Sequence, residues 1–508
     1  MSDEPKTILL IGNGFDLRTG IKTTFKDFLR FVIYGIIWHN YDNPETLEHE
    51  KYRYNFDFKK DFKDKVSIIA QKQRQKEKVS IIAQKQRQKE KANKTKTSKH
   101  PLEILLKIPL LKIPGEKRKK NIAEICRKFV DTEFGKIIFK YIFKTAPYLM
   151  DAISISPKTY ADFLSRDDGK ELIHRVAIFY GLDEDWVSLG EDDLIYHQTP
   201  SAEALETIAY IFETYFDNNR NNIALWSDVE TVIELLVTQD EKLQTKFQIE
   251  KKDLPEWTNE TLKSFSEGLE LFEFLLTQYF LAIQNEINID KKYADEFITK
   301  IEDNYKSSFD QRTRITSGLG NLLKKPLYTP DIIINYNYTN IAERIYENLS
   351  QQPPYALPKP QYTYINGSLE PKHDPSKEGF ATNIVIGYTN SNSGDVPKEL
   401  YHFEKLCRRV IKDTEYFDLN HHIPPDKYIL FDILIIGHSC CIADSDIIGS
   451  LLAHEKLHNA LVLCHTKDDL ISINNNLKHI LGPKKYGELM THNYNKRNHN
   501  LFFAVEEY

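Results

Sequence analysis

The segment Thr7–Leu29 constrains the fold of this chain more than any other part. It reads TILLIGNGFDLRTGIKTTFKDFL and opens with four consecutive apolar residues, as expected for a strand covered by helices on both faces. Gly12 and Gly14 follow, and without a Cβ they allow a sharp turn and leave room for a ligand beside the main chain. Thr24 and Asp27 have the spacing of a helix capping box. The segment therefore predicts a strand, a glycine turn and a helix, with the turn at the ligand-binding edge of a parallel sheet.

Size and composition set broad limits. The 508 residues exceed one ordinary core, so roughly two to four compact units are expected. The net charge of -6 argues against a chain that binds nucleic acid over its whole surface. Five cysteines without CxxC or His/Cys spacing favour a reducing cytosol and predict no metal site. Without a secretory segment or a run of roughly 20 apolar residues, a soluble cytoplasmic protein with no membrane partner is expected.

The chain is predicted to contain four regions, bounded as 1–45, 46–120, 121–325 and 326–508. The first holds the opening strand and helix, and the second is basic and of low complexity. The third shows apolar residues at helical spacing over Ala202–Phe216, Asn222–Thr238 and Thr258–Ile287. It is interpreted as a large all-helical insertion. The fourth returns to alternating strands and helices.

A perfect tandem repeat marks the basic region, with KVSIIAQKQRQKE at Lys65–Glu77 and again at Lys78–Glu90. A period of 13 residues does not keep one apolar stripe on a helix, which counts against a coiled coil. The favoured interpretation is a duplication tolerated on a surface. The alternative is a basic arm that contacts nucleic acid or membrane, although no aromatic residues are interleaved for base stacking.

Short apolar runs predict the remaining strands. They lie at Asp331–Ile334, Tyr362–Ile365, Ile384–Ile386, Ile429–Ile436 and Ala460–Cys464. Helices are expected from Asn340, Asp444 and Asp468. Strands that alternate with helices predict a parallel sheet. The predicted fold is α/β, with a Rossmann-like parallel sheet assembled from both chain ends and interrupted by the insertions.

Polar clusters directly follow four of these strands. They are Ile11–Asp16, Ile334–Asn340, Ile365–Ser368 and Ile436–Asp446. Because the carboxyl ends of parallel strands meet at one edge of a sheet, these clusters are expected to converge there. Their joint placement indicates one shared site.

These clusters resemble the AbiH-type abortive-infection proteins of bacterial phage defence. The resemblance rests on IGNGFDL and the residues after it in Ile11–Phe28, and on the later elements Asn337–Thr339, Asn366–Ser368 and Gly437–Asp444. It implies an antiviral effector acting in abortive infection. A defence-system partner or a homo-oligomer would suit such a role.

More distantly, the chain is similar to sirtuin-like NAD-binding and NADase domains. Asn337-Tyr338-Thr339 with Glu343 follows the spacing of a TNYDxxxE element, with Thr339 in place of its Asp. Asn366-Gly367 stands where such enzymes carry a catalytic His-Gly. This resemblance implies a sirtuin-like fold, NAD as substrate or ligand, and an NAD glycohydrolase that cleaves the N-glycosidic bond.

Hydrolysis of a nicotinamide–ribose bond needs a positioned water and stabilisation of positive charge on the sugar. Asn337 is predicted to orient the water, Asp16 to hold a ribose hydroxyl or stabilise the charge, and His438 to act as base. The Gly12 and Gly14 amides suit a pyrophosphate. The complete set predicted to bind the nucleotide is Gly12, Asn13, Gly14, Phe15, Thr339, Asn366, Gly367, Gly437, Ser439 and Asp444.

Structural alternatives stay open for these residues. Asn337 and Asn366 can equally satisfy backbone groups at strand ends, and His438 can be an ordinary buried histidine. Asp444 can serve as favourable charge at a helix start. A nucleotide-binding sensor without turnover is therefore the alternative function, supported by Thr339 and Asn366. A nucleic-acid-directed toxin that uses the basic region is the least favoured.

Overall fold

The computed structural model describes residues 4–42, 116–142, 226–247, 251, 254, 256–310, 319–350, 359–369, 382–389, 398–412, 414, 417–424, 429–490 and 500–506. The tandem repeat and the helix predicted over Ala202–Phe216 lie outside these residues. The chain divides into two compact units. The first comprises Met1–Phe28 with Ala224–Tyr508, and the second is Leu29–Ile223.

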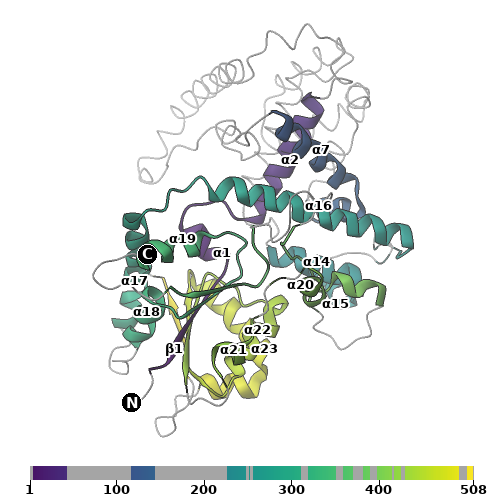
Figure 1. The fold of residues 1–508 in the computed structure, drawn as a ribbon. Helices are drawn as coiled ribbons and strands as arrows, with labels where there is room; N and C mark the ends of the chain where they lie inside the picture. The colour runs from purple at the N-terminus through teal and green to yellow at the C-terminus, as the bar shows by residue number, and fades with distance from the viewer. Residues whose placement is uncertain are drawn as a thin grey trace, which may run out of the picture. The chain divides into compact units, whose positions relative to one another are not determined.

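The first unit contains a six-stranded sheet in the order β3-β2-β1-β4-β5-β6 (Figure 1). The strands are β1 (Lys6–Ile11), β2 (Ile332–Asn335), β3 (Gln361–Tyr364), β4 (Phe431–Ile436), β5 (Leu457–Cys464) and β6 (Asn500–Val505). All neighbouring strands pair in parallel, which confirms the predicted parallel sheet. The N-terminal strand β1 lies between β2 and β4, so both halves of the chain build the sheet.

The register of the three central strands brings their carboxyl ends to one level. Ile11 at the end of β1 is paired with Asn335 of β2 and with Ile436 of β4. The order of the strands along the sheet reverses between β1 and β4. In open parallel sheets this reversal is where loops diverge and ligands bind. The order is compatible with a Rossmann-like arrangement.

Helices cover both faces of the sheet, which explains the unbroken apolar run of β1. Leu9 and Ile11 face a core formed with α17 (Lys291–Asp310), α18 (Leu319–Tyr328) and α19 (Ile341–Ser350). Ile8 and Leu10 face the opposite core, formed with α21 (Leu419–His422), α22 (Ser445–Ala453) and α23 (Lys467–Met490). Side chains alternate between faces along a strand, so each face needs its own apolar set. In Figure 1, α17 and α18 lie on one side of the sheet and α22 and α23 on the other.

The glycine turn leads directly into a short helix, α1 (Asn13–Arg18), before α2 (Phe25–Asp42) begins. The predicted cap of the second helix is confirmed, since the Thr24 hydroxyl accepts from the Asp27 amide at 3.1 Å. The first helix was not predicted. It places Asp16 inside a helical turn rather than in an open loop.

Helices from the middle of the chain complete the first unit. They are α14 (Trp226–Thr238), α15 (Glu241–Phe247) and α16 (Asn259–Gln284). Thr258 caps α16 through a reciprocal capping box with Thr261, which satisfies amides at the start of the helix. Phe272 of α16 packs edge-to-face on Phe28, with ring centroids 5.0 Å apart. The short elements η2 (Lys398–Phe403) and α20 (Lys405–Ile411) lie between β3 and β4, and η3 (Ile442–Asp444) follows β4.

The described part of the second unit is helical. It comprises the continuation of α2, α7 (Glu116–Asp131) and α8 (Glu133–Ile142). Phe129 of α7 packs against Phe134 and Phe139 of α8, with ring centroids 6.2 Å apart in both pairs. Hydropathy along the described helices of the whole chain falls short of a bilayer-spanning segment in every case.

The strands of the structure differ from the predicted ones in two places. Ile384–Ile386 is buried but joins no strand, because the Val385 amide donates to the Asn366 carbonyl and the Ile386 amide to the Glu273 carboxylate. The edge strand β6 was not predicted. Its sequence, Asn500–Val505, carries the apolar run LFFAV directly after a polar stretch.

Candidate functional site

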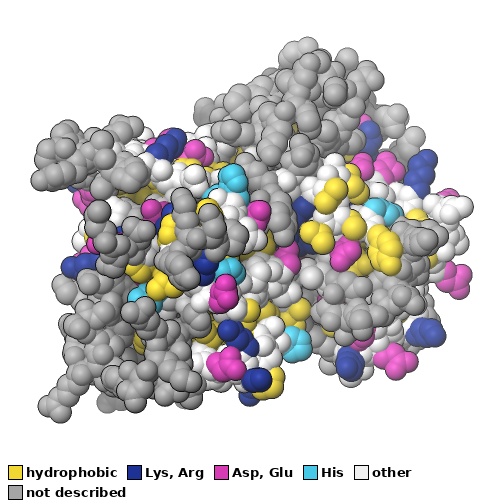
Figure 2. Space-filling model, turned by 60° about the horizontal axis from the view of Figure 1, so that its bottom comes forward, with side chains coloured by type: hydrophobic (Ala, Val, Ile, Leu, Met, Phe, Trp, Pro, Cys, Tyr) yellow, Lys and Arg dark blue, Asp and Glu magenta, His cyan; other side chains and the backbone are white. Residues whose placement is uncertain are grey.

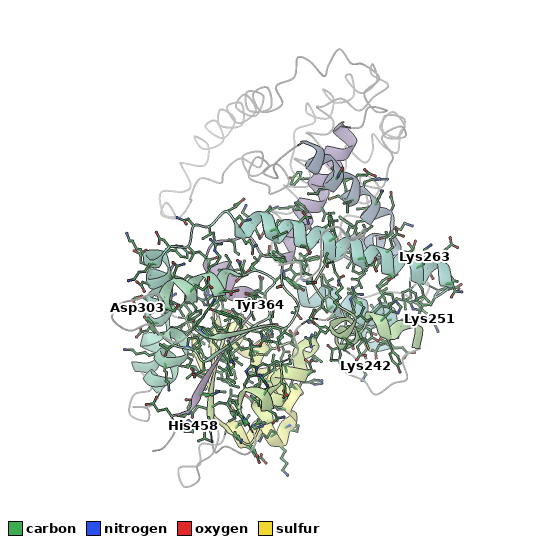
Figure 3. All side chains as sticks on the ribbon, viewed as in Figure 1. Lys242, Lys251, Lys263, Asp303, Tyr364 and His458 are labelled. Carbon is green, nitrogen blue, oxygen red and sulfur yellow. The ribbon has the colours of Figure 1, made fainter. Side chains whose placement is uncertain are left out.

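The polar clusters that follow β1, β2, β3 and β4 meet at the carboxyl edge of the sheet. Tyr364, the last residue of β3, lies at this edge, and His458 near the start of β5 lies at the opposite end of the strands (Figure 3). Hydrogen bonds and ring contacts connect the clusters in pairs. The expectation that these distant segments converge therefore agrees with the geometry.

The glycine turn after β1 packs backbone-to-backbone against the turn after β4. The Gly12 amide donates to the Ile436 carbonyl at 3.0 Å, and the Gly14 amide donates to the Gly437 carbonyl at 2.8 Å. A Cβ added at Gly14 would come 2.7 Å from the Gly437 Cα. The glycines thus bring two loops together, and the space in front of them holds the β4 turn rather than the open room expected from the sequence.

Neighbouring residues of the turn have mixed environments. Asn13 is half-buried in the first turn of α1, whereas the Phe15 ring is fully buried against Phe297, with ring centroids 5.2 Å apart. The Phe15 amide donates to the Gly12 carbonyl at 2.8 Å. A pyrophosphate at this turn would compete with these backbone hydrogen bonds, so its binding by Gly12, Gly14 and Phe15 stays a prediction.

Asp16 is the most unusual group at this edge. Its side chain is buried, and its Oδ2 accepts a hydrogen bond from the Thr339 hydroxyl. Its Oδ1 has no hydrogen-bond partner among the described residues. Burial raises the pKa of Asp16 to about 7, while hydrogen bonds from Thr339 and Asn337 act in the opposite direction. Such a carboxyl exchanges a proton near neutral pH, which is typical of functional sites.

The loop after β2 holds Asp16 in place. The Asn335 side chain accepts from the Asn337 amide at 2.8 Å and donates to the Thr339 carbonyl at 3.2 Å, which folds the loop on itself. The Asn337 side chain donates to the Gly12 carbonyl at 3.0 Å. Asn337 therefore ties the β2 loop to the β1 turn, as its structural alternative predicts, while it also contacts Asp16.

Asn366 and Gly367 after β3 join the same edge. Asn366 donates through its side chain to the Tyr336 carbonyl at 3.2 Å. Gly367 has a φ of 82°, and a Cβ there would come 1.7 Å from the Asn383 carbonyl oxygen. Only glycine fits that position, because a side chain would collide with the backbone.

His438 after β4 has both ring nitrogens engaged. Its Nδ1 accepts from the Cys440 amide at 2.9 Å, and its Nε2 lies 3.3 Å from the Asp444 carboxylate. Tyr336 packs on the imidazole with ring centroids 4.3 Å apart. A general base needs a free nitrogen lone pair, so this arrangement suits a positioning role better than proton abstraction.

The GHSCC turn around His438 is strained. Cys440 is buried and has a φ of 48°, which is unfavourable for a residue with a side chain. Ser439 is exposed at the surface of the loop, and its carbonyl accepts from Asn476 at 3.0 Å. Backbone strain of this kind accumulates at sites where geometry matters for function.

Asp444 belongs to a buried charge network. Its carboxylate and that of Glu230 each lie 2.8 Å from the Lys405 ammonium. Burial raises the pKa of Asp444, but Lys405 and His438 outweigh that effect and hold the pKa well below its ordinary value. Asp444 is thus a fixed anion that anchors His438.

The helix α20 has its charges inside and its apolar side chains outside. Lys405, Arg408 and Arg409 are all buried. Arg408 pairs with the buried carboxylate of Glu273 at 2.7 Å. In contrast, Val410 is 76% exposed and Ile411 69% exposed. The burial of these cations could not be predicted from the sequence KLCRRVI. A run of basic residues usually indicates a solvated face, and the carboxylates that pair with these cations lie far along the chain.

Arg409 and Tyr336 also lie at this edge, and neither was predicted from the sequence as a site residue. Arg409 pairs with Asp446 at 2.6 Å and lies 3.5 Å from the Asn366 side-chain oxygen. Tyr336 is buried, and its hydroxyl has no hydrogen-bond partner in the described part of the chain. Tyr336 could have been included among the predicted site residues, because it lies in INYNYTN directly after β2. In the same described residues, three or more His, Cys, Asp or Glu side chains nowhere gather as metal ligands would.

Comparison with known proteins identifies the family. A family model described as "Bacteriophage abortive infection AbiH" matches residues 155–465. The match includes the clusters after β2, β3 and β4 and covers more than half of the 508 residues. Neither a curated protein nor a solved structure matched the chain. The chain therefore belongs to the AbiH family of bacteriophage abortive infection proteins.

Proposed function

We propose that this protein binds NAD or a related nucleotide at the β1–β4 edge and hydrolyses its N-glycosidic bond during abortive infection. The observation that carries the proposal is the buried Asp16 carboxyl, with one unpartnered oxygen and a pKa of about 7. Its position supports the same conclusion, since the strand order 3-2-1-4-5-6 is that of doubly wound dinucleotide-binding folds. The sirtuin-like resemblance stays a prediction.

The reaction consumes one water and NAD and yields nicotinamide, ADP-ribose and a proton. The bond between the ribose C1′ and the nicotinamide nitrogen breaks, and the water oxygen bonds to C1′. The ionised Asp16 carboxylate accepts the proton of the water or a ribose hydroxyl and stabilises positive charge on the sugar. Asn337 and Thr339 hold Asp16 by hydrogen bonds, so they position the reacting group.

Incubation of purified protein with NAD, followed by quantification of nicotinamide and ADP-ribose, tests the proposal. Asp16→Asn should abolish product formation, whereas Asp432→Asn should not. Asp432 is a matched control because it lies near the start of β4, paired with His458 at 3.0 Å. The assay should be repeated with lysate of phage-infected cells, since a defence-system partner or a homo-oligomer is a proposed activator. If NAD is neither bound nor consumed in any arm, the proposal fails.

A second candidate is a nucleotide-binding sensor without turnover. It is favoured by His438, whose two ring nitrogens are both engaged by protein groups. It predicts that calorimetry detects NAD binding while no nicotinamide forms, and that His438→Ala leaves the affinity unchanged. Nicotinamide release that depends on Asp16 would exclude this candidate.

A further inference from the structure

We infer that Tyr336 and Arg409 form a subsite for a phosphate oxygen, separate from the Asp16 carboxyl and on the other face of the sheet edge. The inference rests on the proposed function, because it assigns the phosphate end of the nucleotide to these residues. None of the candidate residues derived from the sequence includes either side chain. The inference is based on the positions of Tyr336 and Arg409 and on their hydrogen-bond donors that lack an acceptor in the described residues.

Two buried hydrogen-bond donors near Asn366 lack an acceptor in the described residues. The Tyr336 hydroxyl and the Arg409 Nε have no hydrogen-bond partner among the described residues, although Tyr336 is 5% and Arg409 5% exposed. A buried donor without a partner is unfavourable, because it has given up its hydrogen bonds to water and gained none in the protein. Two such donors in one cluster indicate a site that is completed by an acceptor.

The two donors belong to one cluster. Asn366 connects them, since its side-chain nitrogen donates to the Tyr336 carbonyl at 3.2 Å and its oxygen lies 3.5 Å from Arg409 Nη2. Arg409 is held from the other side by Asp446, whose side chain is 34% exposed. The half-exposed Asp446 indicates that solvent reaches this side of the cluster, while the Tyr336 ring is held by His438 at 4.3 Å.

The chemistry of the donors selects the ligand. A guanidinium N–H and a phenol hydroxyl offer hydrogens, which match the oxygens of a phosphate, while Asp446 already balances the charge of the guanidinium. Asp16 offers the opposite, since its free Oδ1 accepts hydrogens from hydroxyl groups. A ligand with hydroxyls at one end and phosphate at the other satisfies both sets, and a nucleotide has this composition.

The two sets lie toward different faces of the sheet. Tyr336 belongs to the core under α22 and α23, whereas Phe15 beside Asp16 belongs to the core under α17 and α19. Gly12 on the strand side of Asp16 and Asn337 next to Tyr336 are hydrogen-bonded to each other and connect the two segments. The ligand is therefore expected to cross the edge between β2, β1 and β4, with its ribose at Asp16 and its phosphate at Tyr336 and Arg409.

Equilibrium binding of ADP-ribose, adenosine and inorganic pyrophosphate to the full-length protein tests the subsite. Tyr336→Phe should weaken ADP-ribose binding by roughly ten-fold or more and leave adenosine binding unchanged. Arg409→Lys, which keeps the charge but loses Nε, should act in the same direction. Tyr362→Phe is the matched control, because Tyr362 in β3 also has a buried hydroxyl without a partner in the described residues.

Thermal unfolding separates a binding role from a folding role. Without ligand, Tyr336→Phe should melt at the wild-type temperature or above it, since the variant removes an unpartnered hydroxyl. Equal ADP-ribose affinity of wild type, Tyr336→Phe and Arg409→Lys would overturn the subsite and leave the proposed function standing. If the wild type binds pyrophosphate through Tyr336 but neither NAD nor ADP-ribose, the subsite stands and the proposed function fails. Binding of none of these compounds overturns both.

Discussion

The Thr339 hydroxyl donates a hydrogen bond to the Asp16 carboxylate across 323 positions of sequence. Thr339 stands where the sirtuin-like resemblance has an aspartate, and the structure gives it a specific partner. Two carboxylates at this contact would repel each other, whereas a hydroxyl stabilises the charged form of Asp16. Thr339 therefore favours the ionised form of Asp16.

Replacing Thr339 by valine removes the donor and should raise the pKa of Asp16 further, because the hydroxyl stabilises the ionised form. The pH at which the proposed NAD hydrolysis reaches half of its maximum should therefore move upward. Thr339→Ser, which keeps the hydroxyl, should restore the wild-type profile. An unchanged profile in the valine variant would show that Asp16 does not set the pH dependence.

The free energy of unfolding should fall as pH rises through the range set by Asp16. The folded pKa of about 7 exceeds the ordinary value of 3.8, so folded Asp16 holds a proton that the unfolded chain has lost. This contribution declines between about pH 4 and pH 7, by up to roughly 4 kcal/mol at full burial. Asp16→Asn should flatten this slope and be more stable than wild type at pH 8. Urea unfolding of both proteins at pH 5 and pH 8 measures the difference, and parallel slopes would contradict it.

Replacing Lys405 by methionine should destabilise the protein by about 3–5 kcal/mol, because it leaves two buried carboxylates without their cation. Lys405 lies 2.8 Å from both Glu230 and Asp444. Adding Glu230→Gln to this variant removes one of the unpaired charges and should recover part of the loss. Chemical unfolding measures both, and a loss below about 1 kcal/mol would show that the network is not strongly coupled.

Gly437→Ala should be more destabilising than Gly482→Ala by roughly 2 kcal/mol or more. Both glycines have positive φ, 65° and 71°. A Cβ at Gly437 would come 2.3 Å from the Phe15 amide nitrogen, whereas a Cβ at Gly482, where α23 is kinked, meets nothing within 4 Å. The comparison isolates the collision between the two loops from the cost of positive φ. Equal thermal midpoints of the two variants would contradict the close packing of the β1 and β4 turns.

On the face that Figure 2 shows, the charges of the described residues do not form a field of one sign. Figure 2 shows acidic and basic side chains interspersed over one face. Mixed charges are the pattern of a solvated surface, whereas nucleic-acid binding needs a field of one sign. The basic region with the tandem repeat lies outside the described residues, so the toxin alternative stays a prediction.

The central strands could be predicted because their apolar runs are long and bounded by polar clusters. β1, β2 and β4 are buried on both faces, and such strands show continuous hydrophobicity. Ile384–Ile386 carries the same signal, yet its amides bond to Asn366 and Glu273. A run of apolar residues indicates burial, but it does not indicate which group the backbone amides are hydrogen-bonded to.

The location of the candidate site could be predicted from the sequence, but the contacts between its side chains could not. Polar clusters after parallel strands must meet at one edge, so Asp16, Asn337 and His438 could be grouped from sequence. The pairing of Arg409 with Asp446 depends on how α20 packs, and no periodicity reports that. The same holds for Asp16, whose carboxylate meets Thr339 through one oxygen and leaves the other without a partner in the described residues, because this contact joins positions 323 residues apart.

The N-terminal strand at the centre of the sheet affects how the protein can be made. β1 is translated long before its partners β2 and β4, which begin at Ile332 and Phe431. The edge that holds Asp16 and His438 is therefore incomplete until most of the chain has been translated. Contacts of such long sequence separation also form slowly. A chain that stops before Phe431 therefore lacks β4 and cannot assemble this edge.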